Sequence, residues 1–223
     1  GSRNLGKQVA DYYNDVAKEL NSKYFSAVPE KWDLAFLSLD SKKGQEYLLE
    51  MRYCVDFALA NRMEMMRVIK GIVSDELNAA ILSLFEPEIN IAHNYAAMEN
   101  HFRQNVMVHR KGATLAREGT IVINPGSQGS KSYIVKGLGN PNSFMSCSHG
   151  AGRKMGRKQA IRELDLETEK KKLDDLGIIH AIRTADDLEE AAGAYKNIDE
   201  VMENQKDLVE IVKTLTPLAV IKG

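Results

Sequence analysis

The residues best suited to chemistry surround a single histidine, His149, which is followed by Gly-Ala-Gly-Arg at residues 150–153. Because glycine and alanine carry little side-chain bulk, the imidazole is open to an incoming group, and the backbone N–H groups beside it can point at an oxyanion or a phosphate. The guanidinium of Arg153 can bind the same anion through two parallel hydrogen bonds. His149 is therefore a candidate nucleophile, general base or metal ligand, and the alternative is a loop histidine hydrogen-bonded to the backbone.

His93 and Asn94 form a second candidate pair, at the end of a run of residues with strand character. A histidine beside a carboxamide suits a metal ligand next to an amide that orients a substrate oxygen. A histidine with a purely structural role is the alternative at this position. No pattern assigns chemistry to the other three histidines: we expect His101 and His109 to be structural or exposed, and His180 to be solvated.

A third candidate is the segment from Asn124 to Ser132, which contains three serines and two glycines after a proline. Its amides and hydroxyl groups can line an anion or a base, and a plain surface turn is the alternative. The segment is not a phosphate-binding P-loop, because the spacing Gly-x4-Gly-Lys-Ser/Thr is absent. The chain also contains neither a dinucleotide-binding fingerprint nor a Cys-x-x-Cys pair.

Positive charge and glycine are concentrated in residues 101–160, around these candidates. The window contains ten Lys or Arg residues against one acid, Glu118, although the 223-residue chain has a formal net charge of −1. It also holds nine of the sixteen glycines. Glycines let N–H groups approach an anion and basic side chains neutralise it, so the window predicts a site that handles phosphate. The alternative is a basic surface balanced by an acidic one elsewhere.

The composition excludes several classes of protein. With 43% apolar and 27% charged residues, the chain is typical of a globular protein. None of its apolar runs approaches the roughly 20 residues that cross a membrane, so we expect no membrane partner. Two cysteines, Cys54 and Cys147, cannot make a disulfide framework, which favours a reducing compartment, and we expect the cytoplasm.

The elements that must position these residues are a mixture of helices and strands. Hydrophobic periodicity predicts helices over residues 4–21, 45–70, 75–85, 153–164 and 197–215. Strands are predicted over residues 88–95, 106–109, 119–123 and 132–135, with a β-prone run at 218–221. The charged residues 165–193 are expected to be loosely helical and peripheral. The predicted fold class is therefore α+β, a mixed sheet core with long flanking helices.

Taken together, seven segments resemble the RtcB family of RNA ligases, in the order in which the family has them. They are His93-Asn94-Tyr95, Arg110-Lys111-Gly112-Ala113, Pro125-Gly126-Ser127-Gln128, Lys136-Gly137-Leu138-Gly139-Asn140, Ser148-His149-Gly150-Ala151-Gly152-Arg153, Ala194-Tyr195-Lys196 and Lys222-Gly223. The resemblance is strong over residues 88–160 and good over 194–223. Residues 4–80 match only in general character, and 165–193 hardly match.

The resemblance implies an RNA ligase that uses GTP and Mn²⁺, in tRNA splicing or RNA repair. Such enzymes join RNA ends that carry a 2′,3′-cyclic phosphate or a 3′-phosphate to 5′-hydroxyl ends. It implies that His149 attacks the α-phosphate of GTP and becomes a histidine–GMP phosphoramidate, from which GMP passes to the RNA 3′-phosphate. A neutral imidazole is available near pH 7 for this attack.

The same resemblance assigns the remaining site residues. It implies that His93 is a Mn²⁺ ligand that also contacts the nucleotide, and that Asn94 contacts a nucleotide phosphate. Arg153 and Arg3 resemble contacts to the RNA phosphate. The other implied nucleotide contacts belong to the histidine loop, to the turn that would line guanine and ribose, and to two residues that would close the pocket: Gly150, Ala151, Gly152, Pro125, Gly126, Ser127, Gln128, Ser132, Tyr195 and Lys222.

The chain departs from the family at two positions and in length. Many relatives carry Met in place of Gln128, and some have a second histidine in place of Ala92. Family members are roughly twice as long, and their first half supplies the rest of the metal site. We therefore expect this chain to be the C-terminal half of an RtcB-type fold and to be inactive alone. The remaining metal ligands would come from the N-terminal half, and the sequence leaves the need for an accessory protein open.

On this interpretation the chain is the C-terminal part of one catalytic domain with three regions. Residues 1–85 would be helical, residues 86–160 would form a strand-rich nucleotide and metal centre, and residues 161–223 would supply peripheral helices and the C-terminal guanine-pocket segment.

Two other functions remain open. The same nucleophile could serve hydrolysis, which would make the protein a metal-dependent phosphodiesterase or phosphatase. Alternatively, the basic window could be a non-catalytic RNA-binding module, whose RNA affinity would depend steeply on salt and would survive loss of His149. A GMP adduct on His149 separates the ligase from both.

Overall fold

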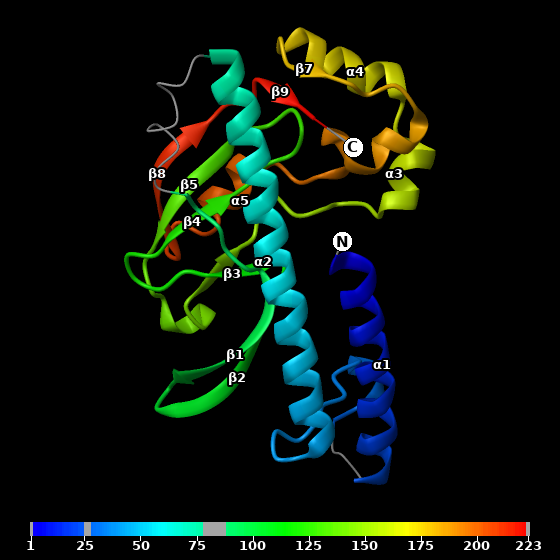
Figure 1. Ribbon diagram of the computed structural model, residues 1–223, viewed down its shortest axis with the longest axis vertical. Coiled ribbons are helices and arrows are strands. Elements are labelled where there is room, and N and C mark those ends of the chain that lie inside the picture. The colour runs from blue at the N-terminus through cyan, green and yellow to red at the C-terminus, as the bar shows by residue number, and fades with distance from the viewer. Residues whose placement is uncertain (1, 25–27, 78–87, 222–223) are drawn as a thin grey trace. The chain divides into compact units, whose positions relative to one another are not determined.

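The computed structural model describes residues 2–24, 28–77 and 88–221 of the chain (Figure 1). Internal contacts divide it into two compact units, residues 1–96 and residues 97–223. The first unit is mainly helical, and the second holds most of the strands together with shorter helices. The three regions expected from the sequence stay a prediction.

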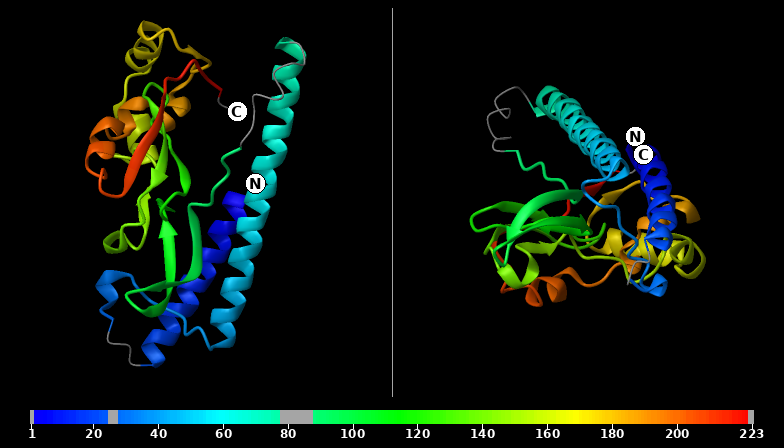
Figure 2. Two further views of the ribbon diagram at one scale, coloured as in Figure 1. Left: turned by 90° about the vertical axis from the view of Figure 1, so that its left-hand side faces the viewer. Right: turned by 90° about the horizontal axis from the view of Figure 1, so that it is seen from below.

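Two long helices, α1 (Ser2–Lys23) and α2 (Lys42–Leu77), lie side by side in the first unit (Figure 2). Tyr13 is buried between them: its ring packs edge-on against Tyr47, with 5.3 Å between the ring centroids, and its hydroxyl donates to Glu50 Oε1 over 3.0 Å. A single-turn 3-10 helix, η1 (Glu30–Trp32), lies in the connection.

The helices predicted over residues 4–21 and 45–70 are confirmed. Residues 75–77 of the next predicted helix belong to α2, and its remainder, 78–85, lies outside the described residues.

A β-hairpin made by β1 (Asn94–His101) and β2 (Gln104–Lys111) follows. Phe102 and Arg103 form its turn with φ angles of 51° and 65°, the left-handed values that a two-residue hairpin turn requires. The prediction of a strand over 88–95 was wrong for its first six residues. Because the turn sits at residues 102–103 and β2 is eight residues long, the pairing partner of β2 is the eight residues before the turn.

Small antiparallel sheets form the centre of the second unit (Figure 1). One has the order β4-β5-β8, from β4 (Ile121–Asn124), β5 (Ser132–Gly137) and β8 (Val209–Leu215). Its inner face carries Val122 and Val135, both fully buried. A second pairs β3 (Ala113–Leu115) with β6 (Ser146–Ser148), and η3 (Pro141–Ser143) precedes β6. β7 (Ile179–His180) and β9 (Ala219–Val220) pair in parallel.

Short helices complete the unit: α3 (Arg157–Glu163), α4 (Leu166–Asp175), η4 (Ala185–Glu190), η5 (Ala192–Ala194) and α5 (Ile198–Glu203). Leu173, Ile178 and Ile182 form a buried cluster there. The segment 165–193, expected to be peripheral, therefore contributes core residues, because its apolar side chains are brought together by the loop after α4 rather than by one helical stripe.

The single helix predicted over 197–215 was wrong. It ends at Glu203, and residues 209–215 form β8 instead, paired antiparallel with β5. This segment contains two valines, an isoleucine and a threonine, whose branched β-carbons favour a strand once β5 offers a partner edge. The helix predicted over 153–164 is shorter than expected and starts at Arg157.

The α+β class predicted from the sequence is confirmed, and the arrangement is consistent with part of an RtcB-type fold. Among the helices of the described ranges, none is both long and apolar enough to cross a membrane.

Candidate functional site

His149 is positioned by strand β6, which ends one residue before it. In the β3–β6 pairing Ser148 lies opposite Ala113, and the backbone N–H of His149 donates to the carbonyl of Gly112 over 3.2 Å. The imidazole is half-buried. The backbone of the candidate nucleophile is thus held at a strand end, while the loop that follows is free of large side chains.

Two buried carboxamides hold Ser148, the residue next to the candidate nucleophile. Asn124, which is fully buried, donates its Nδ2 to the carbonyl of Ser148 and, over 3.1 Å, to its Oγ. Gln205 accepts the Ser148 N–H on Oε1 over 2.9 Å, and its Nε2 lies 3.2 Å from the sulfur of Met202. Ser148 is therefore hydrogen-bonded through its N–H, carbonyl and hydroxyl groups.

The His149 loop and the Pro125 turn lie against each other. The N–H of Ala151 donates to the carbonyl of Pro125 over 3.0 Å. A Cβ added to Gly150 would lie 2.6 Å from that same carbonyl oxygen, closer than real Cβ atoms approach. Glycine at 150 is thus required by this close backbone approach, which brings together two motifs that are separated in sequence. That they bind phosphate stays a prediction.

The Pro125 turn is ordered by its own serines. Gly126 N–H donates to Ser132 Oγ over 3.2 Å, and Ser127 N–H donates to Ser130 Oγ over 2.6 Å. Gln128 is half-buried, and within the described residues its buried Oε1 accepts no hydrogen bond. A buried acceptor without a donor costs free energy unless a ligand supplies one, so this amide oxygen marks the turn as a place for a donor-bearing group.

Helix α5 is tied to the same turn through Asp199. Its carboxylate accepts hydrogen bonds from Tyr133 Oη and, over 3.2 Å, from Lys131 Nζ. The bond to Asp199 raises the pKa of Tyr133 to about 12. The chain after residue 197 is in this way fixed relative to the site.

Arg153 and Tyr195 are brought together at the far end of the His149 loop. The guanidinium carbon of Arg153 stacks 4.9 Å from the Tyr195 ring centroid, and Nη1 donates to Tyr195 Oη over 3.0 Å. Both side chains also bond to Glu190: Arg153 Nη1 lies 3.1 Å from its Oε2, and Tyr195 Oη donates to the same oxygen. Burial alone would raise the pKa of Glu190, but the bonds from Tyr195 and Arg157 lower it. This carboxylate is therefore ionised and neutralises the arginine.

The other predicted site residues belong to the first unit or lie outside the described residues. His93, half-buried, and Asn94, exposed at the start of β1, belong to the unit of residues 1–96, whereas those above belong to residues 97–223. Arg3 lies in the first turn of α1. Lys222 is outside the described residues.

Metal-ligating side chains do not cluster within the described part of the chain. In residues 2–24, 28–77 and 88–221, no group of three or more His, Cys, Asp or Glu side chains is arranged to hold a metal ion. On β2, burial lowers the pKa of His109, which favours the neutral imidazole.

His101 is structural, because its Nε2 lies 2.8 Å from Glu99 Oε2 in a buried cluster. The expectation that His180 is solvated was wrong: only 10% of its side chain is exposed, and its Nε2 lies 3.2 Å from Asp174.

Sequence reasoning assigned no role to Gln205 or Glu190, although both contact site residues. A lone glutamine, or a glutamate within a charged run, carries no local signature. Burial and contact with Ser148 or Arg153 become visible only in the folded chain.

Comparisons with known proteins show which family the chain is similar to. A family model described as "tRNA-splicing ligase RtcB" matches residues 1–223. RNA-splicing ligase RtcB of Escherichia coli K12 is 36% identical over 226 residues, which cover all of this chain and 54% of that protein. The Mycobacterium tuberculosis protein of the same name is 34% identical over 244 residues, or 55% of its length. tRNA-splicing ligase RtcB of Nanoarchaeum equitans is 36% identical over 248 residues, or 51% of its length. The chain thus spans about half the length of these curated relatives.

Proposed function

The chain belongs to the RtcB family of tRNA-splicing ligases, and from that premise we propose that it carries the nucleotidyl-transfer centre of an RNA ligase. The proposed reaction joins RNA ends bearing a 3′-phosphate or 2′,3′-cyclic phosphate to 5′-hydroxyl ends, with GTP and Mn²⁺, in tRNA splicing or RNA repair. We place the protein in the cytoplasm, a proposal that the two free thiols, Cys54 and Cys147, support.

The observation that carries this proposal is the packing of the His149 loop against the Pro125 turn. A nucleophile must be held beside the group that it attacks. The hydrogen bond of 3.0 Å from the Ala151 N–H to the Pro125 carbonyl joins the two segments. We propose that GTP lies over this junction. Gly150, Ala151 and Gly152 would approach its phosphates, and Gly126, Ser127 and Ser132 would line the ribose and base.

The buried Oε1 of Gln128 supports a base that donates a hydrogen bond. Guanine donates through N1–H and its exocyclic amino group; because adenine also carries an amino donor, the choice of guanine rests on the resemblance to the family. Tyr195 and Lys222 would close the pocket, and Asn94 would contact a phosphate.

In the proposed first step the neutral imidazole of His149 attacks the α-phosphorus of GTP. An N–P bond forms, the bond to the β-phosphate oxygen breaks, pyrophosphate leaves and the imidazole loses its proton. The RNA 3′-phosphate then takes the GMP from His149, and the 5′-hydroxyl displaces GMP to form the new phosphodiester. A 2′,3′-cyclic end first takes up one water to give the 3′-phosphate.

The described residues do not by themselves fit a Mn²⁺ ion, because they supply no set of three donor side chains. We propose that His93 is one ligand and that the others come from the part of the relatives that this chain does not span. The His149 loop and the Pro125 turn would then depend on the N-terminal half of the relatives for activity.

Arg3 and Arg153 remain proposed contacts to the RNA phosphate. For Arg153 this requires exchange of the Glu190 carboxylate for a phosphate oxygen, since its Nη1 already bonds to Glu190.

Intact mass after incubation with GTP and Mn²⁺ tests the proposal. The chain would be measured alone and joined to the N-terminal half of a relative, with His149→Ala and, as a matched control, His180→Ala. We expect an acid-labile adduct of the mass of GMP on the joined protein, present in H180A and absent in H149A.

A joined protein that is folded, binds Mn²⁺ and forms no adduct would contradict the ligase and favour a hydrolase or a binding module. An adduct on the chain alone would show that the N-terminal half is not needed for guanylylation.

A further inference from the structure

Residues 152–154 and 194–196 form a short antiparallel ladder beside the site. Lys154 N–H donates to Ala194 O over 2.9 Å, Lys196 N–H donates to Gly152 O over 3.0 Å, and Arg153 is paired with Tyr195. Side chains alternate across such a ladder. Arg153 and Tyr195 therefore share one face, and Lys154 lies with Lys196 on the other.

The arginine face is internally neutralised. Besides Glu190, Arg153 bonds to the carbonyl of Met155 through Nε over 3.0 Å, and only 23% of its side chain is exposed. The neighbouring Arg157 is bound to Glu190 through Nε over 2.9 Å and lies 3.8 Å from Glu189. Any phosphate that binds here must displace an ionised carboxylate.

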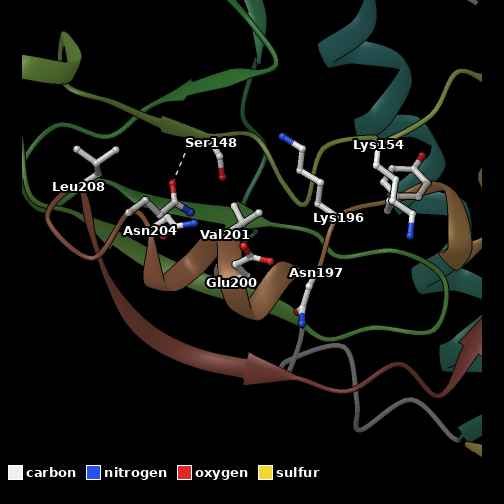
Figure 3. A pocket seen from close by; sticks show the side chains of 10 residues that line it. Ser148, Lys154, Lys196, Asn197, Glu200, Val201, Asn204 and Leu208 are labelled. Atoms are coloured by element: carbon white, nitrogen blue, oxygen red, sulfur yellow. Dashed lines mark hydrogen bonds between the residues drawn. The ribbon is translucent and has the colours of Figure 1, made fainter.

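The lysine face borders a groove of about 700 Å³, which Tyr195 from the other face also lines. Figure 3 shows Lys196 reaching over this groove, with Asn197, Glu200 and Asn204 on α5 and its two caps forming the opposite side. Ser148, the residue before His149, lines the same groove. Lys154 and Lys196 are exposed, and within the described part of the chain their ammonium groups make no ion pair.

We propose that this groove binds the phosphate backbone of the RNA strand that is joined at His149. Lys154 and Lys196 contact two phosphates, and the carboxylate of Glu200 accepts a hydrogen bond from a ribose 2′-hydroxyl. Unpaired ammonium groups bind phosphates without displacing a protein carboxylate, unlike Arg153. The inference rests on the proposed function in taking RNA as the ligand and His149 as the place where the strand is joined.

The dimensions and chemistry of the groove favour a single strand. Its volume is within the ~300–1,000 Å³ range of sites for small ligands, which suits one or two nucleotides and not a duplex. A carboxylate opposite two lysines would repel a further phosphate but accepts a hydroxyl donor. Since only RNA carries the 2′-hydroxyl, Glu200 would select RNA over DNA.

Fluorescence anisotropy of the full chain tests this, with a fluorescein-labelled 12-nucleotide single-stranded RNA and the DNA of the same sequence, in EDTA and without GTP. The test variant is Lys154→Ala/Lys196→Ala, and the control Lys171→Ala/Lys213→Ala removes the same charge from α4 and β8. We expect K154A/K196A to bind RNA about tenfold more weakly at 0.1 M salt, with the slope of log K against log salt reduced by about 1.4, since each single-strand phosphate contact contributes about 0.7.

Glu200→Ala separates the two parts of the proposal. We expect wild type to prefer RNA to DNA and E200A to bind both equally, because the 2′-hydroxyl loses its acceptor. Thermal unfolding by circular dichroism would show that every variant is folded.

Equal losses in the two double variants, or no loss in either, would overturn the lysine contacts. Competition by 1 mM inorganic phosphate as effectively as by unlabelled RNA would reduce the groove to a simple anion site. An RNA preference unchanged in E200A would overturn the ribose contact.

The binding measurement contains no GTP and does not depend on guanylylation. Failure of the groove is therefore distinguishable from failure of guanylylation, which only the mass measurement reports.

Discussion

Replacing Glu99 by glutamine should destabilise the unit of residues 97–223 by about 3 kcal/mol, because it breaks a buried ion pair. Glu99 Oε2 accepts from Arg110 Nη2 over 3.0 Å and a second bond joins Oε1 to Nη1, with only 3% and 1% of the two side chains exposed. Removing one partner of such a pair leaves the other charge buried, which costs roughly 3–5 kcal/mol.

The pKa of Glu99 leads to a similar magnitude. Hydrogen bonding from Arg110 lowers it from 4.5 to about 2, a difference of 2.5 pH units, which corresponds to about 3 kcal/mol. A carboxyl whose pKa is lower in the folded state contributes its full stabilisation above its unfolded pKa. We therefore expect this contribution to be complete above pH 4.5 and to be lost as the pH falls from 4.5 to about 2.

Urea unfolding of wild type and E99Q at pH 7, and then at steps down to pH 3, measures both effects, with equal m-values as the check on two-state behaviour. The matched control is Glu210→Gln. It breaks the exposed ion pair between Glu210 and Lys136, whose atoms are 2.6 Å apart, and should lower the free energy of unfolding by less than about 1 kcal/mol. An E99Q cost no larger than that of E210Q, or a cost that does not shrink below pH 4.5, would refute the reasoning.

Two further substitutions test how the site is held. Gly150→Ala places a Cβ 2.6 Å from Pro125 O and should lower the free energy of unfolding in urea by about 1–3 kcal/mol. The control Gly156→Ala has open space around the added Cβ and should stay within about 0.5 kcal/mol of wild type. Equal effects of the two substitutions would argue against the close approach. Gln205→Ala leaves the N–H of Ser148 without its acceptor and should cost about 1–3 kcal/mol and slow formation of the GMP adduct in the joined protein. Unchanged stability and adduct rate would show that this bond does not position the nucleophile.

The family could be predicted from local sequence. His149 and the small residues after it, the serine-rich turn after Pro125 and the two long N-terminal helices are short-range patterns, because turns and helices depend on neighbours in the chain. Their order along the chain was enough to indicate the RtcB family, which the family match over residues 1–223 confirms.

The contacts that hold the site depended on residues distant in sequence. Gln205 reaches Ser148 across 57 positions, and Arg153 meets Glu190 across 37. Their residue types have no periodic signal, so nothing in the local pattern distinguishes them from solvated side chains.

Strand β8 shows the same limit for secondary structure. Its residues have apolar positions that also fit a helix, and the edge of β5 decides between the two by providing backbone partners. Backbone pairing also places the basic side chains of residues 152–154. Their pairing with 194–196 determines on which face of the ladder each one lies. Local propensity specifies where chemistry can occur, but backbone pairing and burial are collective properties of the folded chain, and they determine which charges are neutralised and which remain exposed to a ligand.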